Sequence, residues 1–176
     1  MHCLEPKDYH KIHNILKASF KTPTFAFSVV NRLIQGSVYV NDSMKPTSGF
    51  LRIRAGDYYV FGQGNDLVFN NSLYRYFVEK VYGKEKRFTV FTPSTDWEAL
   101  FDETFKPYVK KMIRSKYRFV PPKVPSKYNL PDLYELKDFN SDFLRGSENF
   151  NESYIVHYWG SERHFLKNGL GVCFFH

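Results

Sequence analysis

The chain has 176 residues, a formal net charge of +7 and a hydrophobic content of 43%, which excludes a disordered chain and indicates a globular protein. No apolar run is long enough to cross a bilayer, and the N-terminus lacks the apolar core of a signal peptide. Cys3 and Cys173 are too few for a disulfide scaffold, so we expect a cytoplasmic protein with no membrane partner.

The first predicted elements are two helices. The first starts at Pro6 and carries a stripe of apolar residues at three- and four-residue spacing. This stripe consists of Tyr9, Ile12, Leu16 and Phe20. His10 and His13 lie one turn apart, but the sequence fixes no third ligand, so we interpret them as helix surface and predict no metal site. The second helix begins at Thr22-Pro23 and should end at Gly36.

Three short runs of β-branched and aromatic residues follow, at 38–40, 50–53 and 58–61. The gap between the last two is short enough for a tight antiparallel hairpin, and Gly56 is available there for a positive φ. We therefore predict a three-stranded meander at the centre of a sheet.

The chain then alternates between helical and extended patterns. A third helix, capped by Asn70 or Asn71, should end at Gly83, and the apolar run at 87–92 suits a strand covered on both faces. A fourth helix has Thr95 as its cap and an apolar face toward the core. That face consists of Trp97, Leu100, Phe101 and Phe105.

Residues 107–120 alternate between apolar and polar positions and contain no acidic residue, which predicts a long strand with one basic side. The basic residues of the segment are Lys110, Lys111, Arg114, Lys116 and Arg118. We interpret them as the solvated face of a sheet. The alternative is a basic groove for an anionic partner such as a nucleic acid, but few aromatic residues interleave with the basic ones.

The order of elements through residue 120 predicts an α/β fold (mixed α+β), with a twisted mixed sheet and helices on both faces. Residues 121–131 contain four prolines and predict a stiff linker between a domain at 1–120 and a segment at 132–176. The elements expected after the linker are strands at 133–136 and 170–175 and helices at 141–150 and 161–167.

The expected last strand, at 170–175, would have an unpaired edge beside apolar side chains, and such edges pair readily with other chains. We therefore predict that this strand packs against the first sheet or pairs with a second copy of the chain. Self-association through this edge is the resulting partner prediction.

Two stretches resemble a known family. The first runs from Gly36-Ser-Val-Tyr-Val-Asn-Asp42 and Lys45-Pro46 to Asp57-Tyr-Tyr-Val-Phe-Gly62. The second runs from Tyr158-Trp159-Gly-Ser-Glu162 to Phe165-Leu-Lys-Asn-Gly-Leu-Gly-Val-Cys173. They resemble bacterial acetyltransferases typified by the zwittermicin-resistance protein, within the GNAT superfamily. The resemblance implies a degenerate GNAT-like domain at 1–120 and the truncated start of a second GNAT-like domain at 132–176.

The resemblance also implies acetyl-CoA as donor and a small-molecule amine as acceptor in the intact enzyme. Such enzymes hold the pyrophosphate on a glycine-containing turn between the fourth strand and the third helix, through backbone N–H groups. The corresponding turn here, Phe61 to Val68, lacks the family's spacing, and Asp66 would bring a negative charge toward the phosphates. We expect an ordinary loop with no cofactor-binding residues, so this chain alone should bind no cofactor.

The sequence identifies no catalytic residue, since it contains no nucleophile elbow, Walker loop or Cys-x-x-Cys pair. One polar-aromatic cluster lies outside a clear helix stripe: His157, Tyr158, Trp159 and His164. We favour packing at the seam between linker and domain; the alternative makes these four the substrate-contact residues.

Two hypotheses of function remain. In the first, the chain is the N-terminal portion of a GNAT-type N-acetyltransferase, in which proximity and an oxyanion-stabilising N–H supply most of the rate. By itself the chain should then be inactive. In the second, which we rank lower, it is a non-enzymatic binding module that uses the basic strand at 107–120 for an anionic partner.

Overall fold

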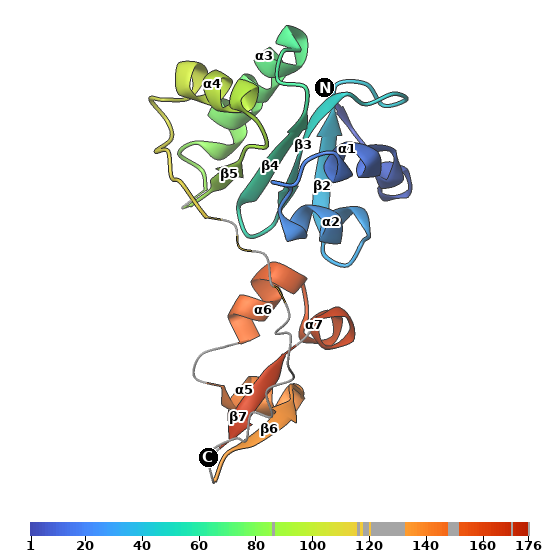
Figure 1. Cartoon of the computed structure of the whole chain (residues 1–176), viewed down its shortest axis with the longest axis vertical. Helices are drawn as coiled ribbons and strands as arrows, with labels where there is room; N and C mark the ends of the chain where they lie inside the picture. The colour runs from blue at the N-terminus through green and yellow to red at the C-terminus, as the bar shows by residue number, and fades with distance from the viewer. Residues whose placement is uncertain are drawn as a thin grey trace. The chain divides into compact units, whose positions relative to one another are not determined.

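A computed structural model describes residues 1–85, 87–115, 117, 120, 133–147, 152–169 and 171–175. The chain divides into two compact units, unit 1 at Met1–Met112 and unit 2 at Ile113–His176 (Figure 1). The predicted linker at 121–131 lies outside the described residues, so the domain boundaries at 120 and 131 stay predictions.

The sheet of unit 1 is built on the predicted meander, which is confirmed. Its strands are β1 (His2–Cys3), β2 (Gly36–Val40), β3 (Ser48–Ile53), β4 (Asp57–Gly62) and β5 (Thr89–Phe91). They lie in the order β1-β2-β3-β4-β5; β1 to β4 pair antiparallel, and β5 adds to β4 in parallel. Gly56 turns the β3–β4 hairpin with a φ of 81°, as predicted.

Helices cover both faces of this sheet, which confirms the predicted mixed α/β fold (Figure 1). One face carries the 3-10 helix η1 (Pro6–Ile12), α1 (His13–Lys17) and α2 (Thr24–Val30). The other carries α3 (Leu67–Tyr76), the π-helical turn η2 (Phe77–Val81) and α4 (Thr95–Thr104).

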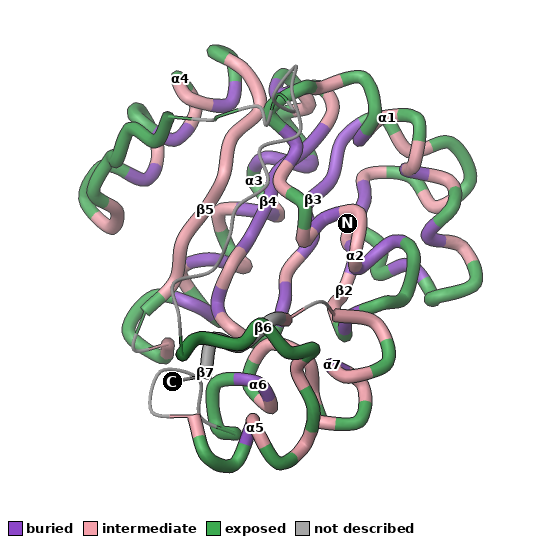
Figure 2. The backbone as a smooth tube through the Cα atoms, turned by 60° about the horizontal axis from the view of Figure 1, so that its bottom comes forward, coloured by how far each residue is buried: buried purple, intermediate pink, exposed green. Residues whose placement is uncertain are grey.

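The core follows from the alternation of side chains along the central strands. Figure 2 shows buried backbone in β3 and β4, where most residues are buried. On the α3 and α4 face, strand and helix side chains form one largely aromatic cluster. It consists of Phe50, Tyr58, Val60, Phe69, Leu73, Phe77, Val81, Trp97, Phe101 and Phe105.

Several predicted helix boundaries are wrong on the first face. The first helical segment ends at Lys17, so Phe20 lies beyond it and is 81% exposed instead of buried. The second helix ends at Val30, and Arg32 takes the left-handed conformation at φ 58°. Gly36 is therefore the first residue of β2 and not a helix stop.

The caps of α3 and α4 also differ from the prediction. Asp66 caps α3, earlier than the predicted Asn70 or Asn71, because its Oδ1 accepts the Phe69 N–H at 2.9 Å. Ser94 occupies the cap position of α4, one residue before the predicted Thr95. The predicted stop at Gly83 agrees with its φ of 72°, two residues after the end of η2 at Val81.

The predicted strand at 107–120 is wrong within its described part, where residues 107–115 form no strand. The Tyr108 and Val109 N–H groups instead hydrogen-bond back to Phe105 O, which continues the end of α4 as a turn. Ile113 is 92% exposed, because an alternating pattern is buried only where a sheet offers a neighbour. The strand predicted at 87–92 is also shorter, at Thr89–Phe91, and half-buried at the sheet edge instead of covered on both faces.

Unit 2 contains a two-stranded antiparallel sheet and short helices. Its elements are β6 (Glu135–Asp138), α5 (Ser141–Gly146), α6 (Glu152–Trp159), α7 (Glu162–Asn168) and β7 (Val172–Phe175). Among its described residues, the buried hydrophobic side chains are Leu144, Ile155 and Phe165. β7 pairs with β6 in the same unit, a pairing that the sequence prediction did not include, and association with a second copy stays a prediction.

Candidate functional site

The turn between β4 and α3, residues 62–66, is where the resemblance would place a pyrophosphate. Gly62 has a φ of 75°, and a Cβ at this position would collide with the Thr47 carbonyl oxygen, so the turn needs glycine here. A Cβ on Gly64 would lie 3.2 Å from the Trp97 backbone nitrogen, so α4 approaches the turn closely. Both glycines therefore serve the packing of the turn against the chain itself.

The carbonyl oxygens of residues 62–64 each accept a hydrogen bond from a side chain of another element. In chain order, the donors are Trp97 Nε1 at 2.9 Å, Ser48 Oγ at 2.6 Å and Asn70 Nδ2 at 2.8 Å. The N–H of Gln63 donates to Thr47 O at 3.0 Å. These bonds to β3, α3 and α4 hold the turn in one conformation.

The N-terminus of α3 is filled by the Asp66 carboxylate. Its Oδ1 accepts from the Phe69 N–H and its Oδ2 from Asn41 Nδ2, both at 2.9 Å. The hydrogen bond from the Phe69 N–H, and to a smaller extent the bond from Asn41, holds the pKa of Asp66 below its usual value of 3.8. An anionic side chain thus already occupies the position at which helix dipole and free N–H groups favour an anion.

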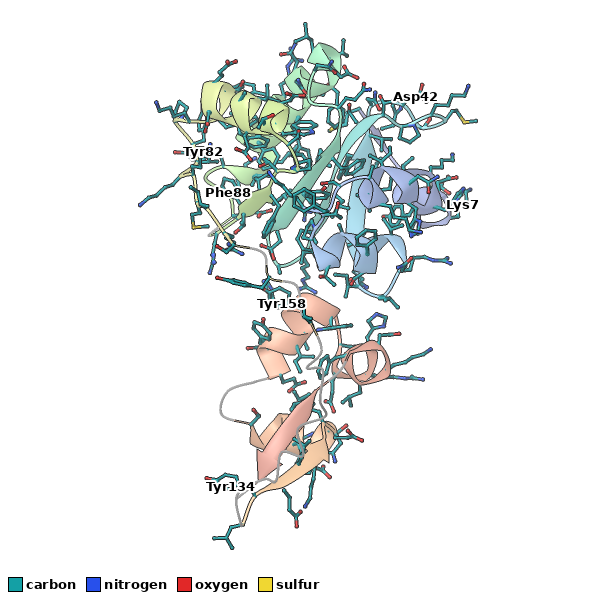
Figure 3. All side chains as sticks on the ribbon, in the orientation of Figure 1. Lys7, Asp42, Tyr82, Phe88, Tyr134 and Tyr158 are labelled. Atoms are coloured by element: carbon teal, nitrogen blue, oxygen red, sulfur yellow. The ribbon has the colours of Figure 1, made fainter. Side chains whose placement is uncertain are left out.

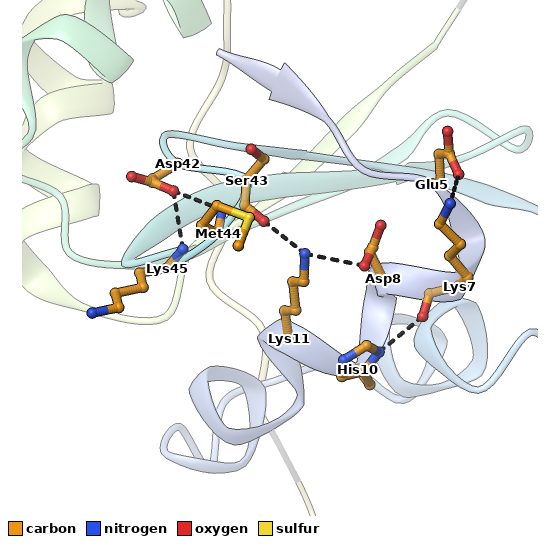
Figure 4. A network of polar contacts seen from close by, with 9 residues as sticks. All are labelled: Glu5, Lys7, Asp8, His10, Lys11, Asp42, Ser43, Met44 and Lys45. Carbon is orange, nitrogen blue, oxygen red and sulfur yellow. Dashed lines mark hydrogen bonds and ion pairs between the residues drawn. The ribbon is translucent and has the colours of Figure 1, made fainter.

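The β2–β3 connection that supplies Asn41 is itself fixed (Figure 4). Lys11 Nζ donates to Ser43 O at 3.0 Å and forms an ion pair with Asp8 at 3.0 Å. Asp42 Oδ1 accepts from the backbone N–H groups of the two residues that follow Ser43, at 2.7 and 2.9 Å. These contacts join the β2–β3 connection, which carries Asn41, to η1.

Trp97 occupies the space beside the turn. Its side chain is fully buried, and its ring meets Phe69 edge-to-face with centroids 6.5 Å apart. Pairing between β4 and β5 ends at Tyr59 and Phe91, so the last residues of β4 have no β5 partner. The sequence predicted that Trp97 is buried, but nothing in the helical stripe indicated its bond to Gly62.

A second set of polar side chains surrounds the buried Tyr58 in unit 1. Tyr58 donates its hydroxyl hydrogen to Glu85 Oε1 at 2.6 Å, and Arg52 Nη1 donates to Tyr76 OH at 3.0 Å. Burial is the main cause that raises the pKa of Tyr58, and the hydrogen bond to Glu85 is the second cause. Burial is also the main cause that raises the pKa of Tyr39 to about 12. Tyr58 and Tyr39 therefore stay protonated near neutral pH, so Tyr58 and its partners suit structural hydrogen bonding and not proton transfer.

The four predicted substrate-contact residues lie in unit 2, three at the end of α6 and one on α7. His157 and Tyr158 are on α6, with ring centroids 5.6 Å apart (Figure 3, where Tyr158 is labelled). Trp159, the last residue of α6, lies 6.4 Å from the His164 ring on α7 and packs on Phe165. The sequence missed α6 because its aromatic and β-branched residues have low helix propensity.

Unit 2 also contains an open hollow of about 510 Å³, formed by residues of α5, α6, α7 and the turn between α6 and α7. Glu152, Glu162 and Arg163 line it, whereas none of the four predicted substrate-contact residues does. The role of those four residues as substrate contacts stays a prediction. The hollow was missed because its charged residues come from separate helices and form no sequence motif.

Other kinds of site have no support in the described parts of the chain. No group of three potential metal-ligating side chains comes together there. In the same residues, no helix has the length and apolar character needed to span a membrane.

The chain is similar to known acetyltransferases. The model of the GNAT acetyltransferase family matches residues 14–176. The uncharacterized N-acetyltransferase YdfB of Bacillus subtilis (strain 168) is 30% identical over 169 residues. That match covers 94% of this chain but 64% of YdfB, so the chain spans less than two thirds of this relative's length.

Proposed function

Because the chain belongs to the GNAT acetyltransferase family, we propose that the protein transfers an acetyl group from acetyl-CoA to the amine of a small molecule. The neutral amine nitrogen attacks the thioester carbonyl, the CoA thiolate leaves, and the nitrogen loses a proton. Alignment of the two reactants and stabilisation of the oxyanion by a backbone N–H would supply most of the rate. We also propose that the chain belongs to the group of acetyltransferases typified by the zwittermicin-resistance protein.

We further propose that unit 1 is a GNAT-like domain without an acetyl-CoA site, and that residues 132–176 belong to a second GNAT-like unit. The observation that carries the first part is the Asp66 carboxylate at the N-terminus of α3, with both oxygens hydrogen-bonded. A pyrophosphate there would have to displace this carboxylate or bind beside its negative charge. The turn would also have to change conformation, and the hydrogen bonds from Trp97, Ser48 and Asn70 to its carbonyl oxygens stabilise the present one.

Calorimetric titration of the 176-residue chain with acetyl-CoA tests the unit 1 proposal. We expect no saturable binding in the low micromolar range, which would correspond to roughly −8 kcal/mol. Backbone NMR shifts locate any weaker binding. Saturable shifts centred on residues 62–69 would overturn the proposal, and an Asp66→Asn variant that then binds more tightly would identify the carboxylate as a barrier inside a real site.

The alternative of a basic module for an anionic partner has lost its structural basis. It required a strand at 107–120 with a continuous basic face, and residues 107–115 form no strand. We therefore propose no second function.

A further inference from the structure

The hollow of unit 2 lies where α6 gives way to α7. Gly160, with a φ of 81°, turns the chain between the two helices and lines the hollow. Val156 and Leu166 form apolar parts of its wall, and Ser141 and Ser161 also line it. Its volume of about 510 Å³ falls in the range of small-molecule sites, roughly 300–1,000 Å³.

Among the described residues, the charged lining consists of two carboxylates and one guanidinium, from Glu152, Glu162 and Arg163. Within the described ranges, no ion pair joins any of the three to another side chain. Ser161 Oγ accepts the His164 N–H at 3.1 Å, which leaves the hydroxyl hydrogen free for donation. The hollow is therefore lined by residues of both signs of charge.

A complementary ligand can be specified from this lining. Two carboxylates favour two ammonium groups, and a guanidinium favours a carboxylate, which it can bind through two parallel hydrogen bonds. Val156 and Leu166 suit the methylene groups that separate such charges. The chemical class with two ammonium groups, one carboxylate and a short methylene chain is a diamino acid.

We propose that this hollow binds the acceptor of the acetyl transfer and that the acceptor is a diamino acid or a compound carrying that group. Glu152 and Glu162 hold the ammonium groups, and Arg163 holds the carboxylate. The inference rests on the proposed function, because it takes the bound amine to be the group that is acetylated. One ammonium group loses its proton before its nitrogen attacks the thioester.

Titration of the isotopically labelled 176-residue chain with L-lysine tests the site without any need for activity. We expect saturable backbone NMR shifts at the hollow, with a dissociation constant on the order of 1 mM or tighter. Norleucine lacks the second amine and cadaverine lacks the carboxylate, so each should bind at least about tenfold more weakly, a loss of about 1.4 kcal/mol. Equal shifts with all three probes, or no saturation by about 10 mM lysine, would overturn the proposal.

Two variants test the assigned charges. Arg163→Gln should remove the preference for lysine over cadaverine, and the double change of Glu152→Gln and Glu162→Gln should remove the preference for lysine over norleucine. Lys167→Gln, on the same helix but outside the lining, is the matched control and should change neither preference. Retained amide dispersion in unit 2 shows that each variant is folded, and unchanged preferences in both charge variants would contradict the assignment.

A separate assay distinguishes this inference from the proposed function. Acetyl transfer from acetyl-CoA to another amine, without any lysine shifts in the hollow, would overturn the inference and leave the function standing. Lysine shifts in the hollow would support the inference even if the 176-residue chain transfers no acetyl group, because we expect that chain by itself not to bind acetyl-CoA.

Discussion

Unit 1 and unit 2 use the same kinds of element but bury very different amounts of them. On the α3 and α4 face of unit 1, aromatic side chains from strands and helices form one continuous cluster. Among the described residues of unit 2, the buried cluster consists of Leu144, Ile155 and Phe165, and all residues of β6 are exposed. Burial of apolar surface is the main source of stability, so we expect unit 1 to be stable and unit 2 to be marginal.

The sheets show the reason for the difference. In unit 1 helices cover both faces, so side chains that point in either direction along β3 and β4 are buried. In unit 2 the sheet has two strands, β6 and β7, and such a sheet is marginally stable in water. The comparison teaches that well-formed local elements do not by themselves make a stable unit.

The largest effect is expected from Trp97→Ala. The side chain is fully buried, so its removal leaves a cavity and should cost about 3–5 kcal/mol in the free energy of unfolding. Trp97→Phe is the matched control; it keeps an aromatic ring but loses the donor to Gly62 O, at a cost of about 1–3 kcal/mol. Urea unfolding followed by circular dichroism measures both. A loss below about 1 kcal/mol in the alanine variant would show that the Trp97 side chain contributes little to the stability of unit 1.

Phe165→Ala makes the corresponding change in unit 2. We expect a smaller loss, about 2–3 kcal/mol, because a unit with so small a core has little stability to lose. Hydrogen exchange should show faster exchange at Leu144 and Ile155 and unchanged exchange in β3 and β4. Equal acceleration in both units would mean that the two units unfold together and that the comparison is wrong.

Asp66→Ala should cost about 1–2 kcal/mol, because it removes the cap of α3. The folded-state pKa of Asp66 lies below its usual 3.8, so its stabilising contribution is complete above about pH 4 and is lost as pH falls through the folded value. The stability difference between wild type and variant should therefore shrink below pH 4 in urea melts. A difference that grows as the pH falls would contradict the assigned cap.

The smallest effect is expected from the double change of Lys110→Glu and Arg114→Glu. Both side chains are exposed in a segment without a strand, so the free energy of unfolding should change by about 1 kcal/mol or less. Gel shifts at several salt concentrations supply the functional measurement. Tight, salt-sensitive binding of the unaltered chain to DNA or RNA, lost in the double variant, would revive the binding-module hypothesis.

The sequence by itself determined the elements whose signals are local. The β-branched runs and Gly56 predicted the meander, and helical periodicity placed Leu73, Phe77 and Phe101 in the core. Helix ends were less well predicted, since α3 is capped by Asp66 and not by the predicted Asn70 or Asn71. The alternation of apolar and polar residues at 107–120 led to a wrong strand prediction within its described part. Such a pattern forms a strand only where a neighbouring strand is available for pairing.

Tertiary structure alone decided the features on which the functional proposals depend. Trp97 reaches Gly62 across 35 positions, and Asn41 reaches Asp66 across 25, so no local pattern could reveal that the turn is filled by the chain itself. The hollow likewise joins residues from three short helices, at positions 141 to 166. Periodicity and propensity describe neighbours along the chain, whereas a site is set by which side chains packing brings together.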